Sequence, residues 1–516
     1  MRRVGIAALL VAGGGAGAAA GAPTAIGWAL AGEGVEAARI GWCAEGMCLT
    51  GLTRGEATAA GVVLRWDRAV RAVDVSVPLA TVMAAGKGAG EGAGETGGGG
   101  GGSWAANLLT RVDVENVVIV GAPVPPLSGQ VWPTRALTGE GVTVEGSTVR
   151  ATVPTEYGSL DLAASPGEGG IVLEVGCAAC RLPAPSEADT DLVLPPVRAT
   201  GTWADGALTG TVRIGTVEAG IVARPTAGAD GAAPAGGTAT VTLPETPIAD
   251  VYAVFASIVP ELGRARIGGT VRAEADVAWP FALTRLDPHI ADFTVDGLVP
   301  DGLAGGTFSF RAVNAAGDEG LVTTGEGTSG WVSLATVGPW LPAAVIAAED
   351  AAFREHPGYS VEGMRDAAAK NAEEGAVVRG GSTLTQQLAK NLFLDGTRSY
   401  ARKLRELLYA VELERELGKR RILEVYLNVV EFGPGLRGAR AAAQTYFLKE
   451  PAGLLPEEAA WLASILRFPR TAWRTQYLTD RPDDRRVDWI LENLRGVPEE
   501  ARLAAVGRPV RLVPPP

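Results

Sequence analysis

The sequence predicts a multidomain protein with an N-terminal membrane helix, a β-rich middle region and a helical C-terminal domain. Three observations support this prediction. No charged residue occurs between Arg3 and Glu33, and apolar and polar residues alternate in runs across the middle of the chain. From Trp331 onward, apolar residues recur at helical spacings of three and four. With 516 residues the chain is too long for one hydrophobic core, so we expect two or three domains.

The N-terminal segment, residues 1–32, is predicted to be a membrane anchor. Its uncharged stretch would span roughly 43 Å as a helix, which exceeds a hydrocarbon core of about 30 Å. Arg2 and Arg3 precede the segment and acidic residues follow it, which places the bulk of the chain outside the cytoplasm. A cleaved signal peptide remains the alternative, because Ala20-Gly21-Ala22 has the form of a cleavage site.

Composition and charge restrict the function classes. The formal net charge is −12, which argues against a nucleic-acid-binding protein. Residues 398–421 are an exception to the acidic average, because eight Lys and Arg residues face only four Glu residues there. A local basic stretch in an acidic protein suggests a specific anionic ligand, although a solvated helix face would have the same composition.

The four cysteines form two local pairs, Cys43 with Cys48 and Cys177 with Cys180. An exported chain can form disulfides, and of the three formal pairings the two local ones are favoured. A Cys-x-x-Cys pair also occurs in redox sites and zinc sites. Here neither a nearby His nor a second Cys-x-x-Cys is present, so we expect a structural disulfide at Cys177 and Cys180.

Residues 33–330 are predicted to form a β-rich extracytoplasmic region. The alternating runs 111–120, 141–153, 206–214, 266–279 and 305–313 predict strands. The Gly-rich stretch 86–103 predicts a flexible loop, and residues 249–263 predict one helical patch. No motif in this region carries chemistry, so a spacer or docking role is expected.

The helical region contains two polar patterns that suggest a site. Glu349 ends an apolar helical run, where partial desolvation raises the pKa of a carboxylate and suits it to proton transfer. Further along, the stretch GGSTLTQQLAKNLFL places Thr383, Gln387, Lys390 and Asn391 on one helix face without an acid. Amides and hydroxyls can recognise sugars, and a lone lysine can bind a phosphate.

Two later helices carry further candidates. Glu406 follows Arg402 by four residues and Lys403 by three, so a helix would frame this carboxylate with cations. The excess positive charge would remain available for an anion. In the run KRRILEVYLN, Glu424 and Asn428 lie on one helix face.

The order of these motifs resembles the peptidoglycan glycosyltransferase family 51, the transglycosylase domain of class A penicillin-binding proteins and of monofunctional transglycosylases. The matching runs are ED-x-x-F-x-x-H-x-G, GGST-x-TQQ-x-x-KN, RK-x-x-E, ILE-x-YLN and G-x-x-G-x-x-x-AA-x-x-YF-x-K. The resemblance covers residues 331–500 and leaves 501–516 as a tail. Leu448 and Arg467 depart from the family pattern, and we expect these changes to affect local packing rather than the carboxylates.

The resemblance implies a lysozyme-like all-α domain and a role for each matching residue. Glu349 would be the general base and Glu406 a second essential acid near a diphosphate. The expected substrate-binding residues are Ser382, Thr383, Gln387, Lys390, Asn391, Arg398, Arg402 and Lys403. Those expected to support the site are Asp350, Phe353, His356, Gly358, Glu424 and Asn428.

The implied reaction polymerises lipid II into a β-1,4-linked glycan with inversion and release of undecaprenyl diphosphate. No cofactor is expected to be required. A divalent cation such as Mg²⁺ or Mn²⁺ would suit the diphosphate, but no dedicated ligand cluster is visible. The expected partners are lipid II, the nascent glycan strand and the membrane, with other cell-wall synthesis proteins as candidates. The expected location is the inner membrane, as a single-pass protein with its bulk in the periplasm.

Two other functions remain open at this point. A lysozyme-like hydrolase would keep the fold but would have no diphosphate to stabilise, so the cations argue against it. A catalytically weak envelope scaffold would make the large β-rich region the functional part of the chain, although the complete motif set argues against that.

Overall fold

The computed structural model describes residues 36–515 except 44–45, 55–56, 66–68, 79–110, 121–136, 146–147, 156, 183–189, 227–235, 280–281, 367–381 and 395–399. The predicted membrane anchor 1–32, the Gly-rich loop 86–103 and Arg398 lie outside these residues. No helix among the described residues is both long and apolar enough to cross a membrane. The chain divides into two compact units, one formed by 1–246 and 271–288 and the other by 247–270 and 289–516.

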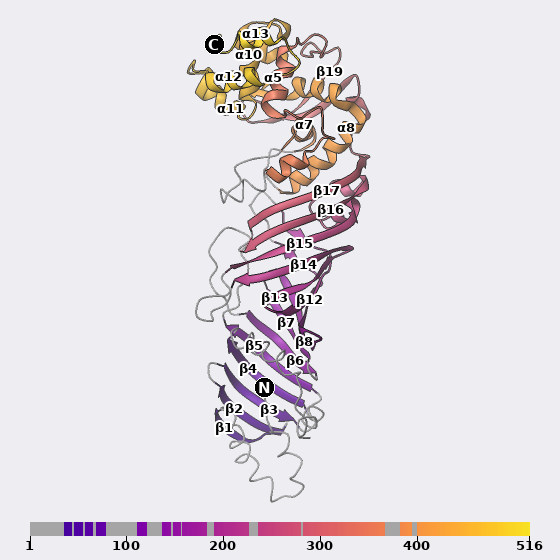
Figure 1. Ribbon diagram of the computed structural model, residues 1–516, viewed down its shortest axis with the longest axis vertical. Coiled ribbons are helices and arrows are strands. Elements are labelled where there is room, and N and C mark those ends of the chain that lie inside the picture. The colour runs from indigo at the N-terminus through magenta and orange to yellow at the C-terminus, as the bar shows by residue number, and fades with distance from the viewer. Residues whose placement is uncertain are drawn as a thin grey trace, which may run out of the picture. The chain divides into compact units, whose positions relative to one another are not determined.

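Most of the strands belong to one fifteen-stranded sheet, in which neighbouring strands follow the order of the chain (Figure 1). From β1 to β15 the pairs are antiparallel, except that β4 and β5 run parallel. The strands are β1 (Glu36–Cys43), β2 (Gly46–Arg54), β3 (Ala57–Arg65), β4 (Ala69–Pro78), β5 (Arg111–Val120), β6 (Leu137–Glu145), β7 (Thr148–Thr155), β8 (Gly158–Gly167), β9 (Gly170–Cys177), β12 (Val197–Ala204), β13 (Ala207–Ile214), β14 (Val217–Thr226), β15 (Gly236–Pro247), β16 (Arg266–Trp279) and β17 (Ala282–Asp296).

The alternation in the sequence predicted several of these strands, because side chains of a strand point alternately to the two faces of the sheet. The predicted run 141–153 covers parts of two strands, β6 and β7. The predicted runs 111–120 and 266–279 coincide with β5 and β16. The predicted disulfide between Cys177 and Cys180 is confirmed. It closes the end of β9 just before the short pair β10 (Arg181–Leu182) and β11 (Leu192–Val193). The side chains of Cys43 and Cys48 lie outside the described part of the structure.

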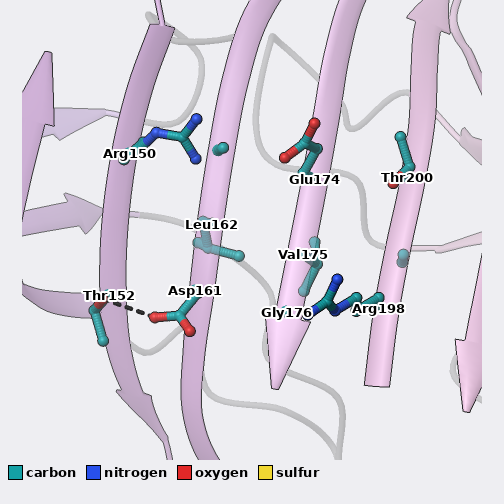
Figure 2. A pocket seen from close by; sticks show the side chains of 11 residues that line it. Arg150, Thr152, Asp161, Leu162, Glu174, Val175, Gly176, Arg198 and Thr200 are labelled. Carbon is teal, nitrogen blue, oxygen red and sulfur yellow. Dashed lines mark hydrogen bonds between the residues drawn. The ribbon is translucent and has the colours of Figure 1, made fainter. Parts of the chain in front are cut away.

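A shallow polar hollow of about 670 Å³ lies over β7, β8, β9 and β12 (Figure 2). Arg150, Asp161, Glu174 and Arg198 project from these strands, and the Thr152 hydroxyl donates a hydrogen bond to Asp161 over 2.9 Å. Two positive and two negative side chains balance one another, and all four are exposed. We therefore assign no site to this hollow.

The second unit is helical and also contains two hairpins, of which only the second lies in the region 331–500 that was predicted to be all-α. Strands β18 (Thr307–Val313) and β19 (Glu319–Gly325) form the first hairpin, and β20 (Glu431–Gly433) and β21 (Leu436–Arg437) form the second. The helices are α4 (Ile248–Ala253), η2 (Pro260–Gly263), η3 (Asp301–Leu303), α5 (Trp340–Glu349), α7 (Leu384–Phe393), α8 (Tyr400–Val429), α9 (Ala439–Phe447), η4 (Pro451–Gly453), α10 (Pro456–Ile465), α11 (Pro469–Ala472), η5 (Trp473–Tyr477), α12 (Asp484–Asn493) and α13 (Glu499–Leu503).

Two groups of helices build this unit. Helix α10 packs against both α5 and α12, and α7 packs against α8 (Figure 1). Helix α10 is buried over almost its whole length, with Trp461 fully enclosed. Helix α8 is broken at Gly418, where φ is +65° and the backbone leaves the helical region, so the two halves of α8 are separate helices.

The helical unit begins earlier in the sequence than the domain boundary that was predicted at 330/331. It includes residues 247–270, where the predicted helical patch 249–263 becomes α4 and η2, and it includes 289–330. These upstream residues pack against α8, as described below. At the other end, the predicted tail 501–516 is partly packed, because the Val513 amide donates to the Tyr446 carbonyl over 2.9 Å and Val510 is buried.

Candidate active site

Glu349 is the last residue of α5, and a chain of hydrogen bonds fixes its side chain. The Gln387 amide nitrogen donates to Glu349 Oε2 over 2.9 Å. The Tyr426 hydroxyl donates to the Gln387 carbonyl oxygen, also over 2.9 Å. Because Tyr426 is fully buried, its hydroxyl holds the Gln387 amide with the NH₂ group toward the carboxylate. Three elements, α5, α7 and α8, therefore meet at Glu349.

The surroundings of Glu349 suit it to accept a proton. Burial raises the pKa of the Glu349 carboxyl above its ordinary value, because desolvation disfavours the charged form. The hydrogen bond from Gln387 and the positive charges of Arg486 and Arg467 act in the opposite direction. Arg486 lies beside the end of α5, where its guanidinium donates to the Ala348 carbonyl over 2.9 Å.

Asp350 follows Glu349 and holds the neighbouring elements together. Its carboxylate accepts from the Leu384 amide over 2.8 Å, at the first turn of α7, where a negative charge is favourable. It also lies 3.0 Å from His356 Nε2, and the His356 Nδ1 accepts from the Gly358 amide. These contacts lock α5, the first turn of α7 and residues 350–358.

Two other residues of this loop are closely packed. Phe353 is buried, with the Lys419 ammonium 4.5 Å from the centre of its ring. Gly358 has φ of +90°, and a Cβ atom there would lie 2.8 Å from Glu414 Cγ, so only glycine fits without displacement.

The structure corrects the prediction that Thr383 binds substrate. Thr383 is the N-cap of α7 and only 3% exposed. Its hydroxyl donates to the Gly358 carbonyl over 2.6 Å and accepts from the Gln386 amide. The Gln386 side chain accepts in return from the Thr383 amide, which completes a capping box. The hydroxyl is therefore used within the protein, and of the four polar residues predicted on this face of α7, Gln387, Lys390 and Asn391 remain candidates for substrate binding.

A cluster of cations surrounds Glu406 on the first half of α8. Glu406 is 1% exposed and forms ion pairs with Arg402 and with Lys403, the latter over 2.6 Å. The Lys403 ammonium also donates to the Ser382 hydroxyl, just before α7. We call Lys390, Arg402, Lys403 and Glu406 the cation cluster.

The cations of this cluster lie close enough to influence one another. Burial, followed by the positive charges of Arg402 and Lys390, lowers the pKa of Lys403 to about 8. Lys390 is exposed, and Asn391 beside it is half-buried, on the surface of α7. An added anion would relieve the mutual repulsion of these cations, so the cluster is suited to an anionic ligand.

Glu424 and Asn428, predicted to support the site, connect the second half of α8 to residues 332–334. The Glu424 carboxylate accepts from the Leu334 amide over 2.8 Å. The Asn428 amide both accepts from and donates to the backbone of Val332, over 2.8 Å each. These bonds fix the segment that leads into α5.

The described residues contain no group of three or more His, Cys, Asp or Glu side chains arranged to hold a metal ion. Near the cation cluster, Glu406 is already paired with Arg402 and Lys403. This donor set does not fit a dedicated divalent-cation site, and we derive no step through a metal.

Comparison with known proteins identifies the helical region. Residues 319–495 match the family model described as transglycosylase. The chain is similar to biosynthetic peptidoglycan transglycosylases, at 47% identity in Thiobacillus denitrificans (30% of this chain, 67% of the relative). Identity is 45% in Dechloromonas aromatica (32% and 71%) and 44% in Alcanivorax borkumensis (36% and 73%). The chain belongs to the biosynthetic peptidoglycan transglycosylase family.

Within the transglycosylase region, sequence analysis missed three residues that act on Glu349. Tyr426 lies in the run ILEVYLN but was given no role, although a tyrosine on a buried helix face signals a hydroxyl that needs a partner. Arg486 lies outside all five motifs. Arg467 was expected to affect packing only, yet its charge lowers the pKa of Glu349, so that expectation is corrected.

Proposed function

We propose that this chain polymerises lipid II into β-1,4-linked glycan strands and releases undecaprenyl diphosphate. The observation that carries the proposal is the position of α7. Its Gln387 holds Glu349, and its Lys390 joins the cation cluster only three residues later, roughly 4.5 Å along the helix axis. One short helix thus connects a proton acceptor to a group of cations.

This arrangement fits an inverting glycosyl transfer. Glu349 takes the proton from the 4-hydroxyl of the acceptor GlcNAc while that oxygen attacks the anomeric carbon of the donor. The bond from this carbon to the diphosphate oxygen breaks, and the electron pair leaves with the diphosphate. Lys390, Arg402 and Lys403 stabilise the negative charge that develops there, and preorganised cations do this without reorganisation during the reaction.

The remaining roles complete the proposal. Arg398 would add a further cation, and Gln387 and Asn391 would shape the donor site. The family membership supports a lysozyme-like fold for the helical domain. The uncharged N-terminal stretch supports a single-pass inner-membrane anchor with the bulk of the chain in the periplasm. Other cell-wall synthesis proteins are proposed as partners of the β-rich region.

The test is a polymerisation assay with labelled lipid II, run in parallel with finished glycan. The parent chain should polymerise lipid II and leave the glycan uncut. Glu349→Gln should lower the rate by at least about 10²–10⁴-fold, the usual contribution of a general base. Circular dichroism should show an unchanged fold. Cleavage of finished glycan would support the hydrolase alternative, and an inactive but well-folded parent would support the scaffold alternative.

A further inference from the structure

The first half of α8, which carries Arg402, Lys403 and Glu406, is held by residues that precede the region matched by the transglycosylase family, 319–495. These residues come from 247–270 and 289–298 and belong to the same compact unit as α8. We call them the upstream brace. Its contacts with α8 include ion pairs and hydrogen bonds of the buried carboxylates Glu261 and Glu412.

A buried ion pair forms the first part of the brace. Glu261, in η2, is 4% exposed, and both of its carboxylate oxygens accept from Arg405 Nε, over 2.8 and 2.9 Å. Arg405 Nη2 also lies 2.8 Å from the same carboxylate. Arg405 directly precedes Glu406, so this pair fixes the helix at the turn that carries the cation cluster. A bidentate pair restricts orientation as well as distance.

Two more contacts fix the same side of the helix. The Tyr252 hydroxyl donates to the Leu404 carbonyl over 3.1 Å. The Arg264 guanidinium donates to the Tyr409 hydroxyl over 2.9 Å. Together with Glu261, these residues contact α8 across two successive turns.

Gly297 and Leu298 form the second part of the brace, and they hold Glu412 of α8. Glu412 is 2% exposed, and its carboxylate accepts from the backbone amides of Gly297 and Leu298, over 2.8 Å each, directly after β17. A buried carboxylate needs such partners, because an uncompensated charge in the interior is costly. Gly297 has φ of +99°, and a Cβ atom there would lie 2.9 Å from the Arg264 carbonyl oxygen. Glycine therefore lets both amides reach the carboxylate.

We propose that Glu261 and Glu412 are positioning residues for transfer from lipid II, which hold α8 so that the cation cluster faces the diphosphate. This rests on the proposed function. Glu261 contacts Arg405, and Glu412 contacts the amides of Gly297 and Leu298. Both therefore act on the cation cluster through helix α8. A displacement of about 1 Å can cost roughly 10²-fold in rate, so a helix that carries the charge-stabilising groups needs such support.

The sign of the effect separates positioning from simple electrostatics. Glu261→Gln and Glu412→Gln each remove a negative charge near the cluster. If charge alone mattered, both variants would bind a diphosphate more tightly. If the carboxylates position α8, both variants should bind it more weakly and react more slowly, despite the added positive potential.

The experiment uses the full chain and three readouts: kcat and KM for lipid II, affinity for farnesyl diphosphate, and hydrogen exchange of residues 400–412. We expect kcat/KM to fall by about 10- to 100-fold in each variant, mainly in kcat. Farnesyl diphosphate should bind more weakly, and exchange in 400–412 should be faster. The control is Glu450→Gln, which breaks an exposed ion pair with Arg440 and should match the parent.

A second variant guards against misfolding. Glu261→Gln leaves Arg405 without its partner, whereas the double variant Glu261→Gln, Arg405→Gln removes both charges and should regain the parent's thermal stability. A low kcat/KM that persists in this stable double variant supports positioning. Parent-like kcat/KM, or tighter diphosphate binding with unchanged exchange, would overturn it. A parent that cannot polymerise lipid II refutes the proposed function instead, and affinity and exchange still decide the role of the brace.

Discussion

At the scale of single residues, the candidate active site depends on two properties of the Glu349 carboxylate: its pKa and its orientation. Burial and the charges of Arg486 and Arg467 shift the pKa of Glu349 in opposite directions, and burial prevails. The hydrogen bond from Gln387, itself held by Tyr426, fixes the direction of the carboxylate. Single substitutions can remove the charge of Arg486 or the hydroxyl of Tyr426, so the pKa and the orientation of Glu349 can be tested separately.

The first residue-scale prediction concerns pH. Glu349, the proposed general base, must be ionised to accept a proton, so the rate should fall as pH decreases through its pKa. The raised pKa places this acid limb at a higher pH than an ordinary glutamate would give. Arg486→Gln removes a charge that lowers the pKa, so the acid limb should move to still higher pH. Arg486→Lys keeps the charge and should move it less. Profiles of kcat/KM against pH measure this, and coincident limbs in parent and Arg486→Gln would contradict it.

The second residue-scale prediction concerns the direction of Glu349. Tyr426→Phe removes the donor that holds the Gln387 amide, and we expect kcat to fall about fivefold, since one hydrogen bond contributes about 1 kcal/mol. The matched control is Tyr446→Phe, which removes another buried hydroxyl, the donor to the Phe432 carbonyl, away from Glu349. Similar losses of kcat in both variants would show that only general stability had changed.

At the scale of elements, the Asp350 carboxylate connects the end of helix α5 to the start of helix α7. Helix α5 ends at Glu349 and Asp350, and Asp350 holds the first turn of α7.

Helix α9 ends in an unusual backbone conformation. The residue that directly follows this helix, Leu448, has φ of +53°, the left-handed conformation that glycine usually adopts at a helix end. The side chain of Leu448 is 72% exposed.

This backbone conformation predicts a stabilising substitution. Leu448→Gly should raise the free energy of unfolding by about 0.5–1 kcal/mol. The left-handed conformation costs an L-residue about 1–2 kcal/mol, and glycine's greater freedom in the unfolded chain offsets about 0.4–1 kcal/mol of the gain. Thermal unfolding measures the change. Leu448→Ala keeps the Cβ atom and should give no gain, so an equal gain would point to the exposed side chain instead.

At the scale of the whole molecule, the boundaries of the compact unit differ from those of the sequence family. The family region begins at residue 319, whereas the helical unit also includes 247–270 and 289–318. Buried groups on α8 have their partners in that earlier segment, as with Glu412 and the amides of Gly297 and Leu298. The residues matched by the family, 319–495, therefore do not contain all the partners of their own buried groups.

These contacts with the upstream segment predict what happens when the chain is shortened. A chain that starts at residue 331 lacks Glu261, the partner of the partly buried Arg405, and the backbone amides that bind the buried carboxylate of Glu412. Leaving a buried charge without its partner costs about 3–5 kcal/mol. Since domains are stable by only about 5–15 kcal/mol, we expect this chain to be unfolded or to melt far below the parent. A chain that starts at residue 236 keeps the brace and should melt at a higher temperature than the shorter chain. Equal melting temperatures would contradict the prediction.

The amino-acid sequence was enough to predict strands such as β5, β13, β16 and β18, the local disulfide at Cys177 and Cys180, and the motifs that carry Glu349 and the cations. These follow from local periodicity and spacing, which any stretch of chain displays without its neighbours. The folded structure was needed to see that Thr383 caps a helix, that Tyr426 and Arg486 act on Glu349, and that Glu261 and Glu412 hold α8. Each of these depends on groups 25 to more than 100 residues apart in the chain. Burial and pairing across such separations leave no periodic pattern in the sequence, because they are properties of the packed interior.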